Sequence, residues 1–262
     1  MQTTLPWALV TGASNGIGLE IAHALAAAGH PVALAARSAD KLEALAHALQ
    51  RDHGVDTRVV AIDLGQRDAA DLLVDTLADM DIHPRVLVNN AGFGVYGLHA
   101  HTLLDDEQAM IDLNITALTR LTKRLLPGML LVRDGRILNV ASTAAFQPGP
   151  YMAVYYATKA YVLSYSEALA EELKDTRVTV TALCPGPTAS GFQDKAAMHD
   201  SALVKGKRLP SAKSVAAYGV RAMQRGQRVA IHGGMNWMLA QSIRFTPRRM
   251  VTWLVATLSR PV

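Results

Sequence analysis

A glycine-rich turn near the start of the chain follows a short apolar run. Residues 7–12 are typical of a buried parallel strand. Gly12, Gly16 and Gly18 come next, and a helical pattern then runs to Gly29. Glycines in such a strand–turn–helix unit let the backbone approach a diphosphate, which lies at the N-terminus of the helix. The spacing is not the Gly-x-Gly-x-x-Gly of the commonest dinucleotide fingerprint, so a purely structural turn is the alternative.

Strand-like and helical patterns alternate along the rest of the chain. The expected strands are 31–36, 57–63, 85–92, 136–141 and 178–184, and the expected helices are 16–28, 40–53, 66–81, 104–126 and 155 to about 174. This order predicts an α/β fold with a doubly wound parallel sheet, which collects its ligands at the carboxyl ends of the strands. A length of 262 residues suits one domain, 1–262.

Arg37 and Ser38 follow the second expected strand, where binders of NAD usually place an acid on the ribose. An arginine at this point accommodates a 2′-phosphate instead, and the preceding residue is Ala36. The sequence therefore favours NADP(H) over NAD(H). Asp63 and Leu64 end the third expected strand and are positioned to contact an adenine. A solvated carboxylate is the alternative for Asp63.

Tyr155 and Lys159 are four residues apart on an expected helix, so they share one face. A nearby ammonium favours the phenolate, so we expect Lys159 to lower the pKa of Tyr155 and make it a general acid and base. Ser142 follows the fifth expected strand, where its hydroxyl could point at the same spot. Taken alone, such a Tyr–Lys pair also fits a solvated helix face.

Asn114 lies inside an expected helix, where asparagine is mildly unfavourable, so it has either a hydrogen-bonding role or an exposed position. Cys184 is the one cysteine, and we expect a buried, inert thiol. We expect no metal site. No signal peptide or spanning helix is predicted, so a cytoplasmic location is expected.

These features together resemble the short-chain dehydrogenase/reductase family, over about residues 5–190. The shared motifs are residues 11–18, 89–92, Asn114, Ser142, Tyr155-x-x-x-Lys159 and Pro185-Gly186. The resemblance implies a Rossmann fold and an oxidoreductase that interconverts a carbonyl and an alcohol. Tyr155 would protonate the carbonyl oxygen while NADPH delivers hydride, or remove the hydroxyl proton in reverse. Ser142 would hydrogen-bond that oxygen.

The same resemblance assigns roles to Lys159, which would also hold the nicotinamide ribose, and to Asn114, which would hold a water linking Lys159 to solvent. Tyr156 is not the expected proton donor, because Ala160 lies four residues on. The expected cofactor-binding residues are Gly12, Ser14, Asn15, Gly16, Ile17, Gly18, Arg37, Ser38, Asp63, Leu64, Asn90, Ala91, Gly92, Tyr155, Lys159, Pro185, Gly186 and Thr188.

The chain departs from the family pattern in two places. The family often has Pro-Gly-x-x-x-Thr, whereas Ser190 occupies that threonine position here, so either Thr188 or Ser190 could serve the nicotinamide. Residues 228–234 and a longer ending replace the family's seventh strand and short tail. Family members commonly form dimers or tetramers, so a homo-oligomer is expected by analogy.

A hydrophobic ketone or aldehyde is the expected substrate, since the side chains expected beside the reacting centre are mostly apolar. They are Val95, Tyr96, Ala144, Phe146, Pro150, Met152, Phe192 and Met198. Small residues before an irregular stretch suggest a lid over about 190–210 that closes on substrate.

The ending, about 235–262, combines apolar side chains with arginines, and Pro247 divides it into two segments. Residues 201–262 carry eleven Lys and Arg and no Asp or Glu. This segment either packs on its own domain or a partner subunit, or touches an anionic membrane or an acidic carrier of the substrate. Nucleic acid is not an expected partner, because no recognised module accompanies the charge.

The sequence thus predicts an NADP(H)-dependent oxidoreductase acting on a small-molecule carbonyl/alcohol pair. A non-catalytic NADP(H)-binding sensor, or a membrane-peripheral interaction protein, is the alternative.

Overall fold

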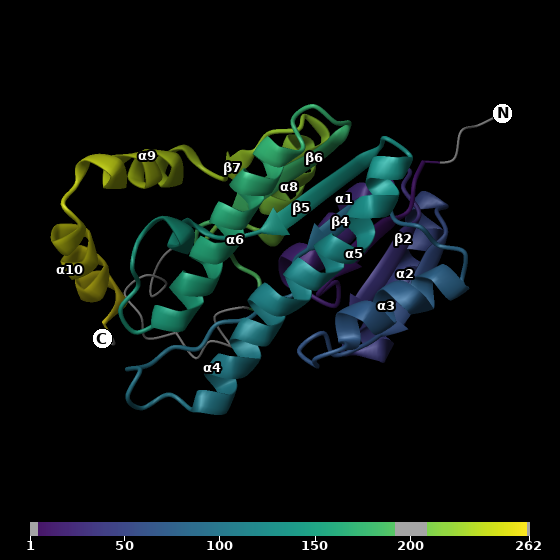
Figure 1. The fold of residues 1–262 in the computed structure, drawn as a ribbon. Helices are drawn as coiled ribbons and strands as arrows, with labels where there is room; N and C mark the ends of the chain where they lie inside the picture. Colours follow the sequence, from purple (N-terminus) through teal and green to yellow (C-terminus); the bar gives the residue numbers. More distant parts are fainter. Residues whose placement is uncertain (1–4, 192–208, 261–262) are drawn as a thin grey trace.

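The computed structural model of the chain describes residues 5–191 and 209–260. Its centre is a sheet of seven strands in the order β3-β2-β1-β4-β5-β6-β7 (Figure 1). The strands are β1 (Ala8–Thr11), β2 (Val32–Ala36), β3 (Thr57–Ala61), β4 (Val86–Asn89), β5 (Gly135–Val140), β6 (Val178–Cys184) and β7 (Val229–Ile231). Every neighbouring pair is parallel. The predicted doubly wound Rossmann-type sheet is confirmed, and the stretch after residue 228 supplies its last strand.

Helices cover both faces of this sheet. They are α1 (Gly16–Ala27), α2 (Ala39–His53), α3 (Ala69–Asp79), α4 (Leu104–Ile111), α5 (Leu118–Leu131), α6 (Ala153–Glu172), α8 (Ala212–Gln224), α9 (Gly234–Ser242) and α10 (Arg248–Ser259). Helices α1, α2 and α8 pack on one face, and α3, α5 and α6 pack on the other.

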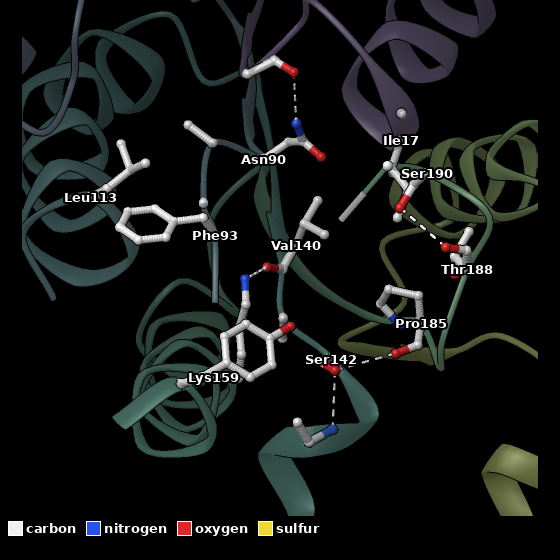
Figure 2. A pocket seen from close by; sticks show the side chains of 18 of the residues that line it. Ile17, Asn90, Phe93, Leu113, Val140, Ser142, Lys159, Pro185, Thr188 and Ser190 are labelled. Carbon is white, nitrogen blue, oxygen red and sulfur yellow. Dashed lines mark hydrogen bonds between the residues drawn. The ribbon is translucent and has the colours of Figure 1, made fainter. Parts of the chain in front are cut away.

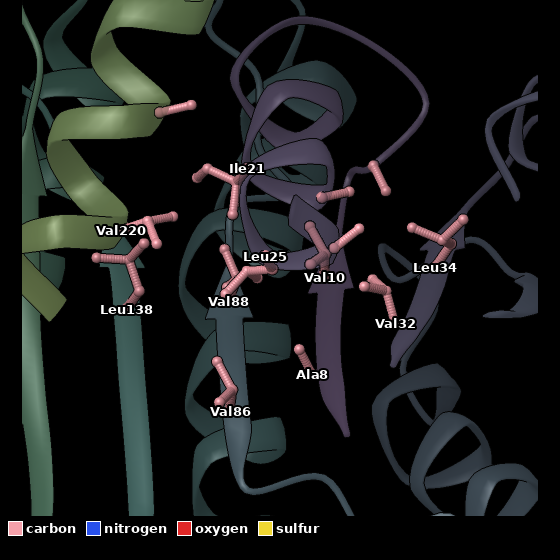
Figure 3. Packing of buried hydrophobic residues seen from close by; sticks show 14 of the residues in the cluster. Ala8, Val10, Ile21, Leu25, Val32, Leu34, Val86, Val88, Leu138 and Val220 are labelled. Carbon is pink, nitrogen blue, oxygen red and sulfur yellow. The ribbon is translucent and has the colours of Figure 1, made fainter. Parts of the chain in front are cut away.

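The strands are apolar throughout because both faces are covered. Figure 3 shows Val10 and Val88 of the sheet meeting Ile21 and Leu25 of α1. Leu9 points to the opposite side and packs with the second cluster. Full burial of one such aliphatic side chain stabilises the fold by about 1.5–3 kcal/mol. This packing fixes the strand ends, where the site is built.

One predicted helix is more complicated than expected. Residues 104–126 were predicted as one helix, but the structure has α4, a π-helical segment η1 (Asp112–Ala117), and α5, which continues past Pro127 to Leu131. The prediction of a helix ending at residue 126 is wrong. Buried apolar residues of α5, Leu125 and Met129, lie on both sides of Pro127, so packing on the sheet extends the helix beyond the proline.

The predicted division of the ending at Pro247 is present: α9 is followed by the 3₁₀ turn η3 (Ile243–Phe245), and Pro247 precedes α10. In Figure 1, α9 and α10 (yellow) extend beyond β7 and turn back beside one end of α6. The predicted lid over 190–210 lies almost wholly outside the described residues. Within those residues, no helix combines the length and apolar character needed to cross a bilayer.

Candidate active site

One large cavity lies at the carboxyl ends of the strands, with a volume of about 1310 Å³. All of the residues predicted to bind a cofactor line it except Gly18. Ser142, Tyr155 and Lys159 line it as well, whereas Asn114 does not. Residues from distant parts of the sequence therefore meet in one chamber, as the sheet topology requires.

The glycine turn after β1 is held by Asn90. The side-chain nitrogen of Asn90 donates to the carbonyl oxygens of Thr11 (3.0 Å) and Gly12 (3.1 Å). Gly12 has φ of +64°, and a Cβ there would lie 2.8 Å from the Asn90 side-chain nitrogen. A Cβ on Gly18 would collide with the same nitrogen and with the Gly12 carbonyl. Gly18 thus permits close packing beneath the turn rather than lining the cavity.

The cavity is lined by Ser14 and Asn15, which precede α1, and by Gly16 and Ile17 of its first turn. The first N–H groups of a helix have no carbonyl partner within it, and the helix dipole favours an anion there. This cradle of backbone and glycine fits the diphosphate of a dinucleotide.

Arg37 and Ser38 lie where β2 ends, and both line the same cavity. The Arg37 guanidinium is 4.0 Å from the carboxylate of Asp63, which also accepts a hydrogen bond from the Gly65 N–H. Both side chains are well exposed, so this pair contributes little stability and leaves the guanidinium accessible to a ligand. Lys41 lines the cavity too and was not predicted. Its place in the first turn of α2, four residues after Arg37, is a signal that could have found it.

Ser142 follows β5 and begins the 3₁₀ turn η2 (Thr143–Phe146). Its hydroxyl accepts from the Ala144 N–H at 3.1 Å and donates to the Pro185 carbonyl at 3.4 Å (Figure 2). Tyr155 is buried on α6. Burial raises the pKa of Tyr155 above its ordinary value, and a hydrogen bond with Ser142 opposes this.

Lys159, one helical turn after Tyr155, is also buried. Its ammonium donates to the Val140 carbonyl at 2.8 Å and lies 5.8 Å from the centre of the Tyr155 ring. Burial lowers the pKa of Lys159 to about 8. The expected lowering of the Tyr155 pKa is not found in the polypeptide by itself, because burial raises that pKa and outweighs the hydrogen bond with Ser142. The effect of Lys159 on Tyr155 stays a prediction.

Asn114 has the hydrogen-bonding role that the sequence allowed. It is buried in η1, where its amide accepts from the Phe93 N–H (3.1 Å) and donates to the Phe93 carbonyl (3.0 Å) and the Thr158 hydroxyl (3.1 Å). A Cβ on Gly92 would lie 2.8 Å from the Asn114 carbonyl oxygen and 3.7 Å from the Lys159 nitrogen. The side chains of Asn114 and Lys159 thus both lie close to Gly92. The water expected of Asn114 stays a prediction.

Thr188 and Ser190 both line the cavity, but at different places. The Thr188 hydroxyl donates to the Gly186 carbonyl at 2.8 Å, and the Ser190 hydroxyl donates to the Thr188 carbonyl at 3.2 Å. Ser190 lies against Gly16, since a Cβ on that glycine would be 2.8 Å from the Ser190 carbonyl oxygen. Ser190 is therefore beside the glycine turn, which favours Thr188 for the nicotinamide.

The predicted substrate-side residues divide into several groups. Ala144 and Met152 line the main cavity, and Val95 and Tyr96 line an adjoining hollow of about 500 Å³. The other four fall elsewhere: Phe146 packs in a separate cluster with α6 and β6, Pro150 lines neither space, and Phe192 and Met198 lie outside the described residues. Phe146 and Pro150 were expected beside the reacting centre, but neither lines the main cavity or the adjoining hollow.

Helices α9 and α10 supply a wall that the sequence did not predict. Its residues are Met235, Asn236, Leu239, Ala240, Val255 and Leu258. The Ser259 carbonyl accepts a 2.6 Å hydrogen bond from the Tyr96 hydroxyl, which fixes the end of α10 to the site. Asn236 packs directly against Gly186: a Cβ on this glycine would lie only 2.6 Å from the side-chain nitrogen of Asn236. No local sequence signal places this segment over the cavity.

Comparisons with known proteins show what this chain is similar to. The model of the short chain dehydrogenase family matches residues 6–200. A very-long-chain 3-oxoacyl-CoA reductase of Anas platyrhynchos is 38% identical over 184 residues, covering 68% of this chain and 58% of that protein. The 17-beta-hydroxysteroid dehydrogenase type 3 of Homo sapiens is 36% identical over 181 residues, with the same coverage.

A solved structure, a short-chain dehydrogenase from Sphingobium yanoikuyae in complex with NADPH, has a TM-score of 0.81 and 30% identity, covering 92% of this chain and 94% of that one. The chain belongs to the short-chain dehydrogenase/reductase family, a class of oxidoreductases that use a nicotinamide dinucleotide. It spans 58% of the length of the curated relatives that it matches.

Proposed function

We propose that this chain catalyses the NADPH-dependent reduction of an apolar ketone or aldehyde to an alcohol, and the reverse oxidation. One observation carries the proposal: a single cavity joins the glycine turn and Arg37 to Ser142, Tyr155 and Lys159. Cofactor-binding and proton-transferring groups thus share one chamber.

The preference for NADP(H) rests on the charge at the end of β2. Arg37 and Lys41 offer two cations, and Ser38 offers a hydroxyl, where a ribose 2′-phosphate would lie. The residue before them is Ala36, so no carboxylate at that position competes for a 2′-hydroxyl. The NADPH complex of the Sphingobium yanoikuyae relative supports the same choice.

Proton transfer falls to Tyr155. Its phenol carries a proton at neutral pH, and because burial raises its pKa, donation to a carbonyl oxygen needs a nearby positive charge. Ser142, which is hydrogen-bonded to Tyr155, would hold the same oxygen. The buried charge of Lys159 would stabilise the phenolate left after donation. A bound nicotinamide would supply the hydride.

An apolar substrate is supported by the walls that flank these groups. Ala144, Met152, Val255 and Leu258 bring methyl and thioether groups to the cavity. Apolar linings select apolar ligands, and a few polar groups orient them. Relatives named for very-long-chain 3-oxoacyl-CoA and for 17-beta-hydroxysteroids act on compounds with large apolar parts.

The test is NADPH oxidation with acetophenone, 2-decanone and a long-chain 3-oxoacyl thioester, using wild type and two tyrosine variants. We expect Tyr155→Phe to lower kcat by about 10²–10⁴ while leaving NADPH binding nearly unchanged. Tyr156→Phe is the matched control, because Tyr156 lines the same cavity and its ring centre is 6.1 Å from that of Tyr155. Tight NADPH binding without turnover of any carbonyl would favour the non-catalytic sensor instead.

A further inference from the structure

The segment from η3 through α10 has two different sides. Val251 and Ser259 of α10 are buried, and Val255 and Leu258 line the cavity. The opposite side carries Met250, Trp253 and Leu254, which are spaced i, i+3 and i+4 and therefore share one face. With Phe245 of η3, these four side chains form what we call the outer patch.

The outer patch is unusually exposed for its composition. Phe245 is 88% exposed, Trp253 69%, Met250 59% and Leu254 50%. Large aromatic side chains gain about 1.5–3 kcal/mol when fully buried, so exposing two of them together is costly without a partner.

Four exposed arginines lie close to this patch along the chain. Arg249 precedes Trp253 by four residues and Arg260 follows it by seven, so both lie along the Trp253 side of α10. Arg244 and Arg248 flank Phe245 along the chain and are exposed. Residues 201–262 contain no Asp or Glu, so no acid from this segment neutralises them. The partner must therefore offer apolar contact and negative charge together.

We propose that the outer patch docks the protein on an anionic phospholipid bilayer. Arginine side chains bind lipid phosphates, while tryptophan, phenylalanine and methionine enter the boundary between headgroups and acyl chains. A second copy of this chain fits less well, because a symmetric contact would place the same arginines against one another. This inference goes beyond the proposed function, since docking requires neither cofactor nor substrate.

Vesicle co-sedimentation of the full chain tests the proposal, with phosphatidylcholine alone or mixed with phosphatidylglycerol. Wild type should bind the anionic vesicles and not the neutral ones, and binding should weaken at high salt. Tryptophan fluorescence should shift to the blue only with anionic vesicles, and the shift should be lost in Trp253→Ser, which keeps Trp7 and Trp237. Removing two charges with Arg248→Gln and Arg249→Gln should weaken binding about 30-fold, from about 1 kcal/mol per arginine.

Matched controls separate this patch from general charge and hydrophobicity. Arg221→Gln with Arg225→Gln removes the same charge from exposed positions at the end of α8. The apolar test variant is Phe245→Ser with Trp253→Ser, which should lose vesicle binding. Its control is Leu131→Ser, which removes an apolar side chain that is 85% exposed and lies outside the outer patch. The controls should bind like wild type, and all variants should retain wild-type NADPH binding, which shows that they are folded.

Three outcomes would overturn the proposal. Equal loss of vesicle binding in controls and patch variants would mean non-specific attraction. Absent vesicle binding, together with a dimer in light scattering that Phe245→Ser and Trp253→Ser dissociate, would assign the patch to a second copy. Capture by poly-L-glutamate without vesicle binding would assign it to an acidic protein. All three leave the reductase proposal untouched.

Discussion

The side-chain nitrogen of Lys159 lies 2.8 Å from the carbonyl oxygen of Val140, the last residue of β5. The backbone of the sheet, rather than the phenol one turn away, therefore holds this ammonium. The lysine is buried, and its pKa of about 8 is well below that of an exposed lysine.

This shift predicts a specific dependence of stability on pH. Between about pH 8 and 9.5, unfolded chains keep the Lys159 proton and folded chains release it, so stability rises with pH by up to about 1.4 kcal/mol per unit. Lys159→Met removes this rise. Urea unfolding across the range should show the free energy of unfolding of wild type increasing relative to the variant. The exposed Lys123→Met is the control and should keep the wild-type slope.

The cations after β2 predict a change in cofactor preference. Arg37→Ala should weaken NADPH binding by tenfold or more, because a 2′-phosphate loses a charge-assisted hydrogen bond, about 1.5–3 kcal/mol, while NADH binding stays the same. Lys41→Ala should act in the same direction with a smaller effect. Side-by-side titrations followed by nicotinamide fluorescence measure both. Tighter binding of NADH than NADPH by wild type would refute the assignment.

A buried polar network that joins β4, β5 and α6 predicts a loss of stability. Asn139 of β5 accepts from Asn89 at 2.9 Å and donates to Ser166 of α6 at 2.9 Å. Asn139→Leu removes one hydrogen bond from Asn89 and one from Ser166. Asn89 still donates to Thr122 and Ser166 to Val162, so we expect the loss of two buried hydrogen bonds, about 1–3 kcal/mol in urea unfolding. Ser166→Ala should cost less, because Asn139 keeps its hydrogen bond from Asn89 and the Val162 carbonyl lies within helix α6.

Two glycine-to-alanine substitutions should differ in their effects: one should weaken NADPH binding, and the other should stabilise the fold. Gly18→Ala places a methyl group against Asn90 and the Gly12 carbonyl, so it should weaken NADPH binding by distorting the turn. Gly128→Ala in α5 meets nothing within 4 Å and should stabilise the protein by about 0.5–1 kcal/mol. Thermal unfolding and NADPH titration of both variants check this, and normal NADPH affinity in Gly18→Ala would show that the turn tolerates a side chain.

The sequence predicted the parts of this protein that depend on local pattern. Apolar runs and glycine spacing predict the alternation of strands and helices along the chain, and the parallel sheet then brings Arg37, Asn90 and Ser142 to one edge. The pKa of Tyr155 could not be predicted, because helical spacing says nothing about burial. The π-helical segment at Asn114 and the wall from α9 and α10 depend on packing between distant segments, which a single sequence does not encode in any short motif.

Nucleotide binding in the cavity can be used to follow assembly of the parallel sheet during refolding. Residues that follow β1, β2, β3, β4, β5 and β6 all line it, and parallel neighbours cannot pair through a tight hairpin. Such pairings are non-local and slow to form. Nucleotide affinity should therefore appear late during refolding, after circular dichroism has recovered, and a nicotinamide fluorescence trace would time the closing of the last strand.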